Sequence, residues 1–249
     1  MRAPILTLFV AVACAGCAST GGSVDPEVND PFERANRAIF RFNQTADRYV
    51  LRPVAVGYRN ITPDPLERSI SKFFTNLSSP VVIVSDLLQG KFKHAGSDTA
   101  RFLINSTIGV FGFLDPATHM GLEYRAEDFG QAFGRWGIGE GPYLMLPIVG
   151  PSTFRDGIGR LLELPFQPIA YIEDNGGRNA SVVLYSLDTR VGLITSEVAL
   201  ESAFDQYLFL RDAYLQRREF LIHDGDPPLL EDDFGFDESF SEEDFLGGE

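Results

Sequence analysis

Cysteine is almost absent from this chain. The 249 residues contain two, Cys14 and Cys17, and none follows them. The body of the chain therefore has no disulfide framework and no cysteine-based metal site. Histidine is also sparse, because His94, His119 and His223 stand far apart and show no metal-ligand spacing. Such a body must be held together by packing, for which about 200 residues suffice.

Motifs for catalysis and long apolar runs are missing as well. There is no Gly-x-Ser-x-Gly nucleophile motif and no Gly-x-x-x-x-Gly-Lys phosphate loop. Glu123, Glu127 and Asp128 are close in the chain, but they favour a solvated surface over an acid–base pair. No run reaches the roughly 18 to 20 apolar residues of a membrane-spanning helix. We expect no enzyme activity, no metal or cofactor, and no conventional spanning helix.

Residues 1–16 are typical of a lipoprotein signal peptide. Arg2 provides a positive n-region, and the apolar run 5–13 is too short to span a membrane. Small residues lead to Cys17, which we expect to carry the acyl anchor. Cys14 also follows small residues, and an ordinary secretory signal is a further alternative. Ala18, rather than Asp, follows Cys17, which favours the outer membrane, and residues 17–29 are predicted to be a flexible tether.

Negative charge is concentrated at the C-terminus. Of the formal charge of −14, residues 224–249 supply eleven acids and no Lys or Arg. Without this tail and Arg2, 24 acids face 20 bases, so the body lacks the positive charge of a nucleic-acid binder. We expect a disordered tail that either keeps the protein soluble or docks on a partner through its spaced phenylalanines. These are Phe234, Phe236, Phe240 and Phe245.

A first amphipathic helix is predicted after Asp30-Pro31-Phe32-Glu33, with Asp30 as N-cap. Its apolar face repeats every three or four residues, at Phe32, Ala35, Ile39, Phe42, Ala46 and Tyr49. A basic stripe follows the same period about 140° away, at Arg34, Arg37, Arg41, Arg48 and Arg52. The helix either lies on a membrane with guanidinium groups meeting phosphates, or packs on a core with a solvated basic face.

Further helices are predicted on both sides of a glycine-rich middle. Asp64-Pro65 starts one through Ile70, Phe73, Phe74 and Leu77, and Ser79-Pro80 starts another over 81–88. Residues 91–108 follow a helical pattern with Phe92, Ala95, Thr99, Leu103 and Ile104 inward. From Asn179 a three–four spacing returns at Leu184, Leu187, Val191, Ile194 and Val198, and a last helical segment containing Phe204, Tyr207, Leu208 and Phe220 runs to Ile222.

Between residues 109 and 159, glycines and prolines exclude long helices. The glycines are densest in 129–143, but Pro142 stands where a dinucleotide fingerprint needs its helix to begin. Glycines alternating with Trp136, Ile138 and Tyr143 instead favour a tightly turned, aromatic-lined loop where backbones approach closely.

Several further motifs occur in order over about residues 30–222. They are Asp30 to Glu33, Asn36-Arg37, Phe42-Asn43, residues 52–55, 101–109 and 136–143, Leu146-Pro147, Gly150, Arg155-Asp156 and 214–217. Together these motifs resemble the VacJ/MlaA family of outer-membrane lipoproteins. The chain departs from the family pattern at Gln206, where Pro is frequent, and at Cys14 in the lipobox. The first affects a local turn and the second the anchor.

The resemblance implies a mainly α fold for residues 30–223, a ring-like bundle of short amphipathic helices with a Gly/Pro-rich loop or hairpin, embedded in one membrane leaflet. It implies a non-enzymatic lipoprotein on the periplasmic face of the outer membrane. Such a protein removes mislocalised phospholipids from the outer leaflet through an amphipathic channel and passes them to a soluble periplasmic MlaC-like carrier. It also associates with a trimeric porin. Alternatives are a porin-bound scaffold that moves no lipid and, further off, a lipid hydrolase.

The same resemblance suggests two groups of channel residues, each of which can equally be structural. The first group shapes the first helix and comprises Asn36, Arg37, Phe42 and Asn43. The second belongs to the glycine-rich loop and comprises Trp136, Gly137, Gly139, Gly141, Pro142 and Tyr143. For the glycines the structural role is favoured.

Overall fold

The computed structural model describes residues 30–194 and 197–227, which are mainly helical. In chain order the helices are α2 (Glu33–Ala46), α3 (Arg52–Ile61), α4 (Asp64–Leu88), α5 (Phe92–Thr107), α6 (Pro116–His119), α7 (Phe129–Arg135), α8 (Phe154–Glu163), α9 (Asn175–Gly192), α10 (Glu197–Ser202) and α11 (Gln206–Ile222). A π-helical turn, Asp47–Leu51, joins α2 to α3, and 3-10 turns at Leu164–Phe166 and Pro168–Tyr171 precede α9. Strands β1 (Tyr143–Leu146) and β2 (Gly150–Thr153) form an antiparallel hairpin.

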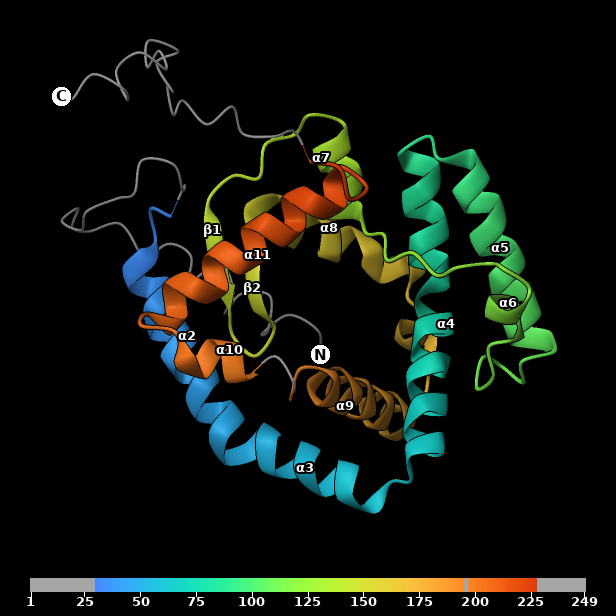
Figure 1. Cartoon of the computed structure of the whole chain (residues 1–249), viewed down its shortest axis with the longest axis horizontal. Helices are drawn as coiled ribbons and strands as arrows, with labels where there is room; N and C mark the ends of the chain where they lie inside the picture. The colour runs from blue at the N-terminus through green and yellow to red at the C-terminus, as the bar shows by residue number, and fades with distance from the viewer. Residues whose placement is uncertain (1–29, 195–196, 228–249) are drawn as a thin grey trace, which may run out of the picture.

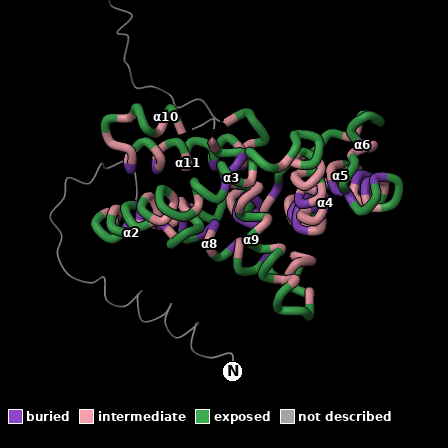
Figure 2. The backbone as a smooth tube through the Cα atoms, turned by 90° about the horizontal axis from the view of Figure 1, so that it is seen from below, coloured by how far each residue is buried: buried purple, intermediate pink, exposed green. Residues whose placement is uncertain are grey.

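The helices are arranged as a flat ring. Figure 1 shows α2, α3, α4, α7, α8 and α11 around a central region, with α5 on the outer side of α4. Turned by 90°, the same elements form a layer rather than a ball (Figure 2). The predicted mainly helical, ring-like class with a hairpin in its glycine-rich part is therefore confirmed.

Contacts between successive neighbours close the ring. Helix α4 packs on α5, α7 and α9, α7 packs on α8 and α11, and α2 packs on β1 while α11 packs on β2. Helix α9 contacts α3, and Arg190 on α9 donates a hydrogen bond from Nη2 to Oδ2 of Asp47 in the π-helical turn, at 2.8 Å. This ion pair fixes α9 to the π-helical turn that links α2 to α3.

Two predicted helix starts need correction. Helix α4 runs unbroken through Pro80 instead of restarting at Ser79. The hydroxyls of Ser78 and Ser79 bond to carbonyls four residues back in the turn that the proline disturbs, and packing on α5 and α7 holds both halves in line. At the other start Asp30 does not cap α2, which begins at Glu33, because the Asp30 carboxylate bonds to Asn36 and Tyr207 instead.

The later helical region also differs from the prediction. Helix α9 starts at Asn175, four residues before the predicted start, because Asp174 caps it by accepting from the Gly177 N–H. The predicted continuous stripe to Val198 is wrong, since α9 ends at Gly192 and Val198 lies in the separate α10. The expected signal peptide, Cys14, Cys17, the tether before residue 30 and the tail beyond residue 227 lie outside the described residues.

Candidate functional site

The described part of the chain has an inverted distribution of polarity. Its buried residues include 18 polar or charged side chains against 14 apolar ones, while many large apolar side chains are exposed. In a protein surrounded by water, buried charge is rare and a large exposed apolar surface marks a site of interaction. The candidate site is therefore the ring as a whole, with polar contacts inside it and apolar side chains outside.

Helix α5 shows the inversion most clearly, and it overturns a prediction. Phe92 and Leu103, expected to face inward, are 72% and 56% exposed. Of the predicted inward residues Ala95 is buried, but the rest of the buried face is polar, formed by Asp98, Arg101 and Asn105. The apolar periodicity was correct as a pattern, but its side of the helix faces away from the protein.

Helix α2 presents a third face to the rest of the protein. Neither the apolar stripe nor the basic stripe is buried, because Phe42 and Tyr49 are exposed, as are Arg41 and Arg48. The buried residues are Asn36 and Phe40. Within the basic stripe, Arg34 is exposed, Arg37 is paired with Glu33 and Asp205, and Arg52 is paired with Glu197 and Glu201.

Asn36 and Asn43 fasten α2 to the edge of the hairpin. Asn36 donates from Nδ2 to the Tyr143 carbonyl at 2.9 Å and accepts from the Met145 N–H at 2.9 Å. Asn43 makes a similar pair of bonds at the end of β1, to the Leu146 carbonyl at 2.9 Å and from the Ile148 N–H in the following turn at 2.7 Å. The two side-chain amides thereby satisfy backbone groups of the strand and of its turn, which makes both asparagines positioning residues for the hairpin.

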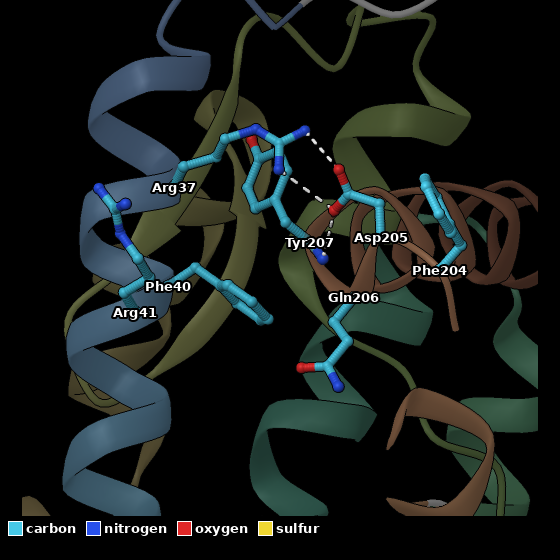
Figure 3. A pocket seen from close by; sticks show the side chains of 7 residues that line it. All are labelled: Arg37, Phe40, Arg41, Phe204, Asp205, Gln206 and Tyr207. Atoms are coloured by element: carbon cyan, nitrogen blue, oxygen red, sulfur yellow. Dashed lines mark hydrogen bonds and ion pairs between the residues drawn. The ribbon is translucent and has the colours of Figure 1, made fainter. Parts of the chain in front are cut away.

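A groove of about 320 Å³ lies where α2 meets the start of α11. Figure 3 shows the Arg37 guanidinium over the Tyr207 ring, 4.5 Å from its centroid, and bonded to Asp205 with Nη2 2.8 Å from Oδ2. The hydrogen bond with Asp205 is the largest influence that raises the pKa of Arg37, so its charge is fixed. Arg41 lines the same groove without an ion pair among the described residues, and Phe204 beside it is fully exposed.

A buried ion cluster joins α7, α8 and α11. Arg218 Nη2 lies 2.9 Å from Asp128 Oδ1 and 3.0 Å from Asp156 Oδ1, and the Tyr214 hydroxyl donates to Asp156 at 2.6 Å. Gly130 permits this approach, since a Cβ there would stand 2.4 Å from Asp156 Oδ1. Burial opposes the charge of Asp128, but the hydrogen bond and the charge of Arg218 together with the hydrogen bonds from Gln131 outweigh it and lower the pKa of this carboxyl.

A second buried cluster joins α5 to α6. Arg101 Nη2 lies 2.6 Å from Asp115 Oδ2, and Asn105 donates to Asp115 Oδ1 at 2.9 Å. Burial works against ionisation of Asp115, but the hydrogen bonds from Thr118, Arg101 and Asn105 prevail and hold its pKa at about 2. The prediction of a solvated acidic surface is wrong for Glu127 and Asp128, because Glu127 is buried against Lys91 at 2.8 Å and Asp128 pairs with Arg218.

The glycine-rich loop connects α7 to the hairpin through turns. Gly137 and Gly141 have left-handed φ angles of 81° and 69°, which explains the glycines there, while a Cβ on Gly139 would meet open space. Trp136 is 53% exposed and donates from Nε1 to the Leu88 carbonyl at the end of α4, at 2.8 Å. Pro142 accepts from the Phe154 N–H at 3.0 Å, and Tyr143 is buried in the core with Phe40 and Tyr207.

The two predicted groups of site residues meet through Tyr143, whereas Trp136, at the other end of the loop, bonds to the end of α4. Asn36, Asn43 and the Tyr143 end of the loop are in contact at the seam between α2 and the hairpin, and Arg37 lies in the adjoining groove. Phe42 and Trp136 are exposed. Sequence reasoning missed Tyr207, Asp205, Arg218 and Arg101, although the Asp-Gln-Tyr start of the last helix and the Arg101 motif were visible signals.

The described residues contain no group of three or more His, Asp or Glu placed to hold a metal ion. Along the described ranges, no helix combines the length and the apolar character needed to cross a bilayer.

The chain is similar to proteins of one family. The model of the MlaA lipoprotein family matches residues 28–221. The intermembrane phospholipid transport system lipoprotein MlaA of Escherichia coli (strain K12) is 34% identical over 215 residues, covering 85% of each chain. The protein of that name from Haemophilus influenzae is 33% identical over 229 residues, 89% of this chain and 91% of its own. A structure solved in work on the structural basis for maintenance of bacterial outer membrane lipid asymmetry superposes with a TM-score of 0.70 at 34% identity, covering 78% of this chain and 98% of that one.

Proposed function

The chain belongs to the MlaA lipoprotein family, and on that premise we propose that it moves phospholipid out of the outer leaflet of the outer membrane and so maintains lipid asymmetry. The observation that carries this proposal is the inverted polarity of the ring. Exposed apolar side chains suit contact with acyl chains, and the open groove that Arg37 and Arg41 line between α2 and α11 suits contact with a headgroup. The lipid is handed to a soluble periplasmic carrier of the MlaC kind, beside a trimeric porin.

The flat shape of the ring determines how it sits in the membrane under this proposal. Helices that do not combine the length and the apolar character of a spanning helix can lie within one leaflet if their backbone groups are satisfied internally and their apolar faces meet lipid. Exposed side chains such as Phe92, Leu103 and Phe111 supply that apolar face. A lipid anchor at Cys17 keeps the protein at the periplasmic side.

Residues at the seam between α2 and the hairpin hold the channel in shape. Asn36 and Asn43 position the hairpin, Arg37 and the groove next to it offer a polar path, and Phe42 contacts lipid. The loop residues Trp136, Gly137, Gly139, Gly141, Pro142 and Tyr143 give the channel wall its turns. No residue is assigned a catalytic role, because a channel of this kind breaks no bond.

The deciding experiment measures outer-leaflet phospholipid in cells that lack the protein, using an added phospholipase that cannot cross the membrane. We expect more cleavable lipid in the deletion, and restoration by the wild type but not by a chain with both Cys14 and Cys17 changed to Ser. An unchanged amount in the deletion contradicts the proposal and favours the porin scaffold, which copurifies with porin yet carries no lipid. Release of fatty acid from labelled vesicles by the purified protein would instead indicate a hydrolase.

The orientation in the leaflet is tested separately. Single cysteines are introduced at exposed apolar positions, Leu103 and Phe111, and at exposed polar Glu123, in a chain that lacks Cys14 and carries an environment-sensitive dye at the new thiol. Because no cysteine follows Cys17, and the lipid anchor blocks the thiol of Cys17, each label has one site. In phospholipid vesicles we expect a blue-shifted emission at 103 and 111 but not at 123. Equal emission at all three positions contradicts the embedded ring.

A further inference from the structure

Two buried carboxyl groups face each other between α4 and α5 and have no role in the proposed function. Asp86, near the end of α4, is 0% exposed, and Asp98, in the second turn of α5, is 2% exposed. The carboxyls are within hydrogen-bonding reach of one another. None of their four oxygens has a hydrogen-bond donor among the described residues. Two such groups cannot both be ionised without a large desolvation cost.

The neighbouring cations do not remove this problem. Lys91, at the start of α5, forms ion pairs with Glu127 and Asp224. Arg101 is taken up by Asp115, and Arg125 and His94 approach Asp98 without a hydrogen bond to it. Glu127, on the segment before α7, adds another negative charge facing Asp86. The pair therefore lies in an environment that favours a neutral carboxyl.

We propose that Asp86 and Asp98 share one proton and that the hydrogen bond this proton makes between them holds α5 against α4. A protonated carboxyl supplies the one hydrogen-bond donor that the pair lacks, and the second carboxylate accepts from it. Loss of the proton places two negative charges in the seam between the helices, where they repel each other. Helix α5, which carries the exposed apolar stripe, is then held less tightly to the ring.

The titration behaviour agrees with this geometry. Burial, followed by the hydrogen bond with Asp98, raises the pKa of Asp86 to about 7. Burial also raises the pKa of Asp98. In the unfolded chain both groups titrate near pH 4. Between about pH 4 and pH 7 the folded chain therefore binds more protons than the unfolded chain, so its stability falls as the pH rises.

The test compares Asp98→Asn, Asp86→Asn and the control Glu123→Gln, which removes an exposed carboxyl. Unfolding of the full-length chain by denaturant in detergent is followed from pH 4 to pH 8. For the wild type and the control we expect the unfolding equilibrium constant to rise by up to about a thousandfold between pH 4 and 7, as three pKa units imply. Asp98→Asn, whose amide can donate to Asp86, should flatten that rise and be more stable than the wild type at pH 8.

A second measurement keeps the proposal falsifiable if a variant fails to fold. Infrared spectra of the folded wild type should show the carbonyl band of a protonated carboxylic acid at pH 6, and the band should disappear as the pH passes 7. Its absence at pH 6, or a pH profile of the wild type as flat as that of Asp98→Asn, would overturn the proposal. So would a loss of stability at pH 8 in both asparagine variants.

Discussion

Asn36 and Asn43 lie two helical turns apart on α2, and each bonds with both ends of its side-chain amide to the hairpin, Asn36 on β1 and Asn43 where β1 passes into its turn. Replacing Asn36 by Ala leaves a buried carbonyl and a buried N–H of β1 without partners. We expect a loss of about 2 to 4 kcal/mol in the free energy of unfolding, measured by denaturant titration, because each unsatisfied group costs about 1 to 3 kcal/mol. Asn60→Ala, on the exposed surface of α3, is the control and should be near neutral.

Gly130 is in a helix, yet its replacement by Ala should destabilise the protein. A Cβ at this position would stand 2.4 Å from Asp156 Oδ1 and 2.6 Å from Arg218 Nη2. Relief of that clash requires movement of the buried ion cluster, at a cost of about 1 to 3 kcal/mol. The matched control is Gly96→Ala on α5, where nothing lies within 4 Å and the gain in helix propensity should stabilise by about 1 kcal/mol. If neither variant had a lower unfolding temperature than the wild type, the described packing would be contradicted.

Arg218 and Arg217 are neighbours in α11 with opposite environments. Arg218 is 7% exposed and lies between two carboxylates, whereas Arg217 is exposed. Arg218→Met removes the cation that Asp128 and Asp156 share and leaves Asp156 with Arg155 alone, and we expect it to cost about 3 to 5 kcal/mol. Arg217→Met should change the free energy of unfolding by less than about 0.5 kcal/mol. Equal effects of the two substitutions on denaturant midpoints would refute the cluster.

Acid should weaken the α5–α6 junction through Asp115. Hydrogen bonds hold the pKa of this carboxyl at about 2, below its value in the unfolded chain, so its contribution is present above pH 4 and is lost as the pH falls toward 2. The contribution is about 2 kcal/mol on that shift. Asp115→Asn should lower stability at pH 7 while flattening the decline below pH 4. A variant with the acid profile of the wild type would contradict this assignment.

The sequence predicted the class of fold and the existence of most helices, but it did not predict which side of a helix faces the protein. Apolar periodicity marks a face, and the inference that this face is buried assumes water on the other side. On α5 that assumption failed, because Phe92 and Leu103 point outward while Arg101 and Asn105 are buried. The polar residues Asp98, Arg101 and Asn105 recur on α5 as regularly as its apolar residues do. The helix therefore has two candidate buried faces, and only the tertiary structure determines which one is buried.

The contacts of the predicted site residues could not be predicted from the sequence for another reason. Asn36 was singled out beside Arg37 in a motif, but its partner Tyr143 is 107 residues away. A side-chain amide can bond to a strand with both of its ends only where the tertiary structure places that strand beside it. Glu127 and Asp128 show the same limit, since the sequence does not reveal that Lys91 and Arg218 are brought to this acidic segment, where Glu127 is buried and Asp128 is half-buried.

The seam between α2 and the start of α11 joins the two ends of the described chain, and this has a consequence for the order of folding. Arg37 and Asp205 are separated by 168 residues, and Asp30 and Tyr207 by 177. Contacts of such sequence separation carry a loop-closure entropy and tend to form late, while the pairing of α4 with α5 and of α7 with α8 is local and can form early. Until Tyr207 is available, α2 is held to the far side of the ring by its bonds to the hairpin region alone, and Asp30 and Arg37 lack their partners from the last helix. Docking of α11 therefore comes late and shortens the time for which the newly exported polypeptide exposes surfaces that can aggregate.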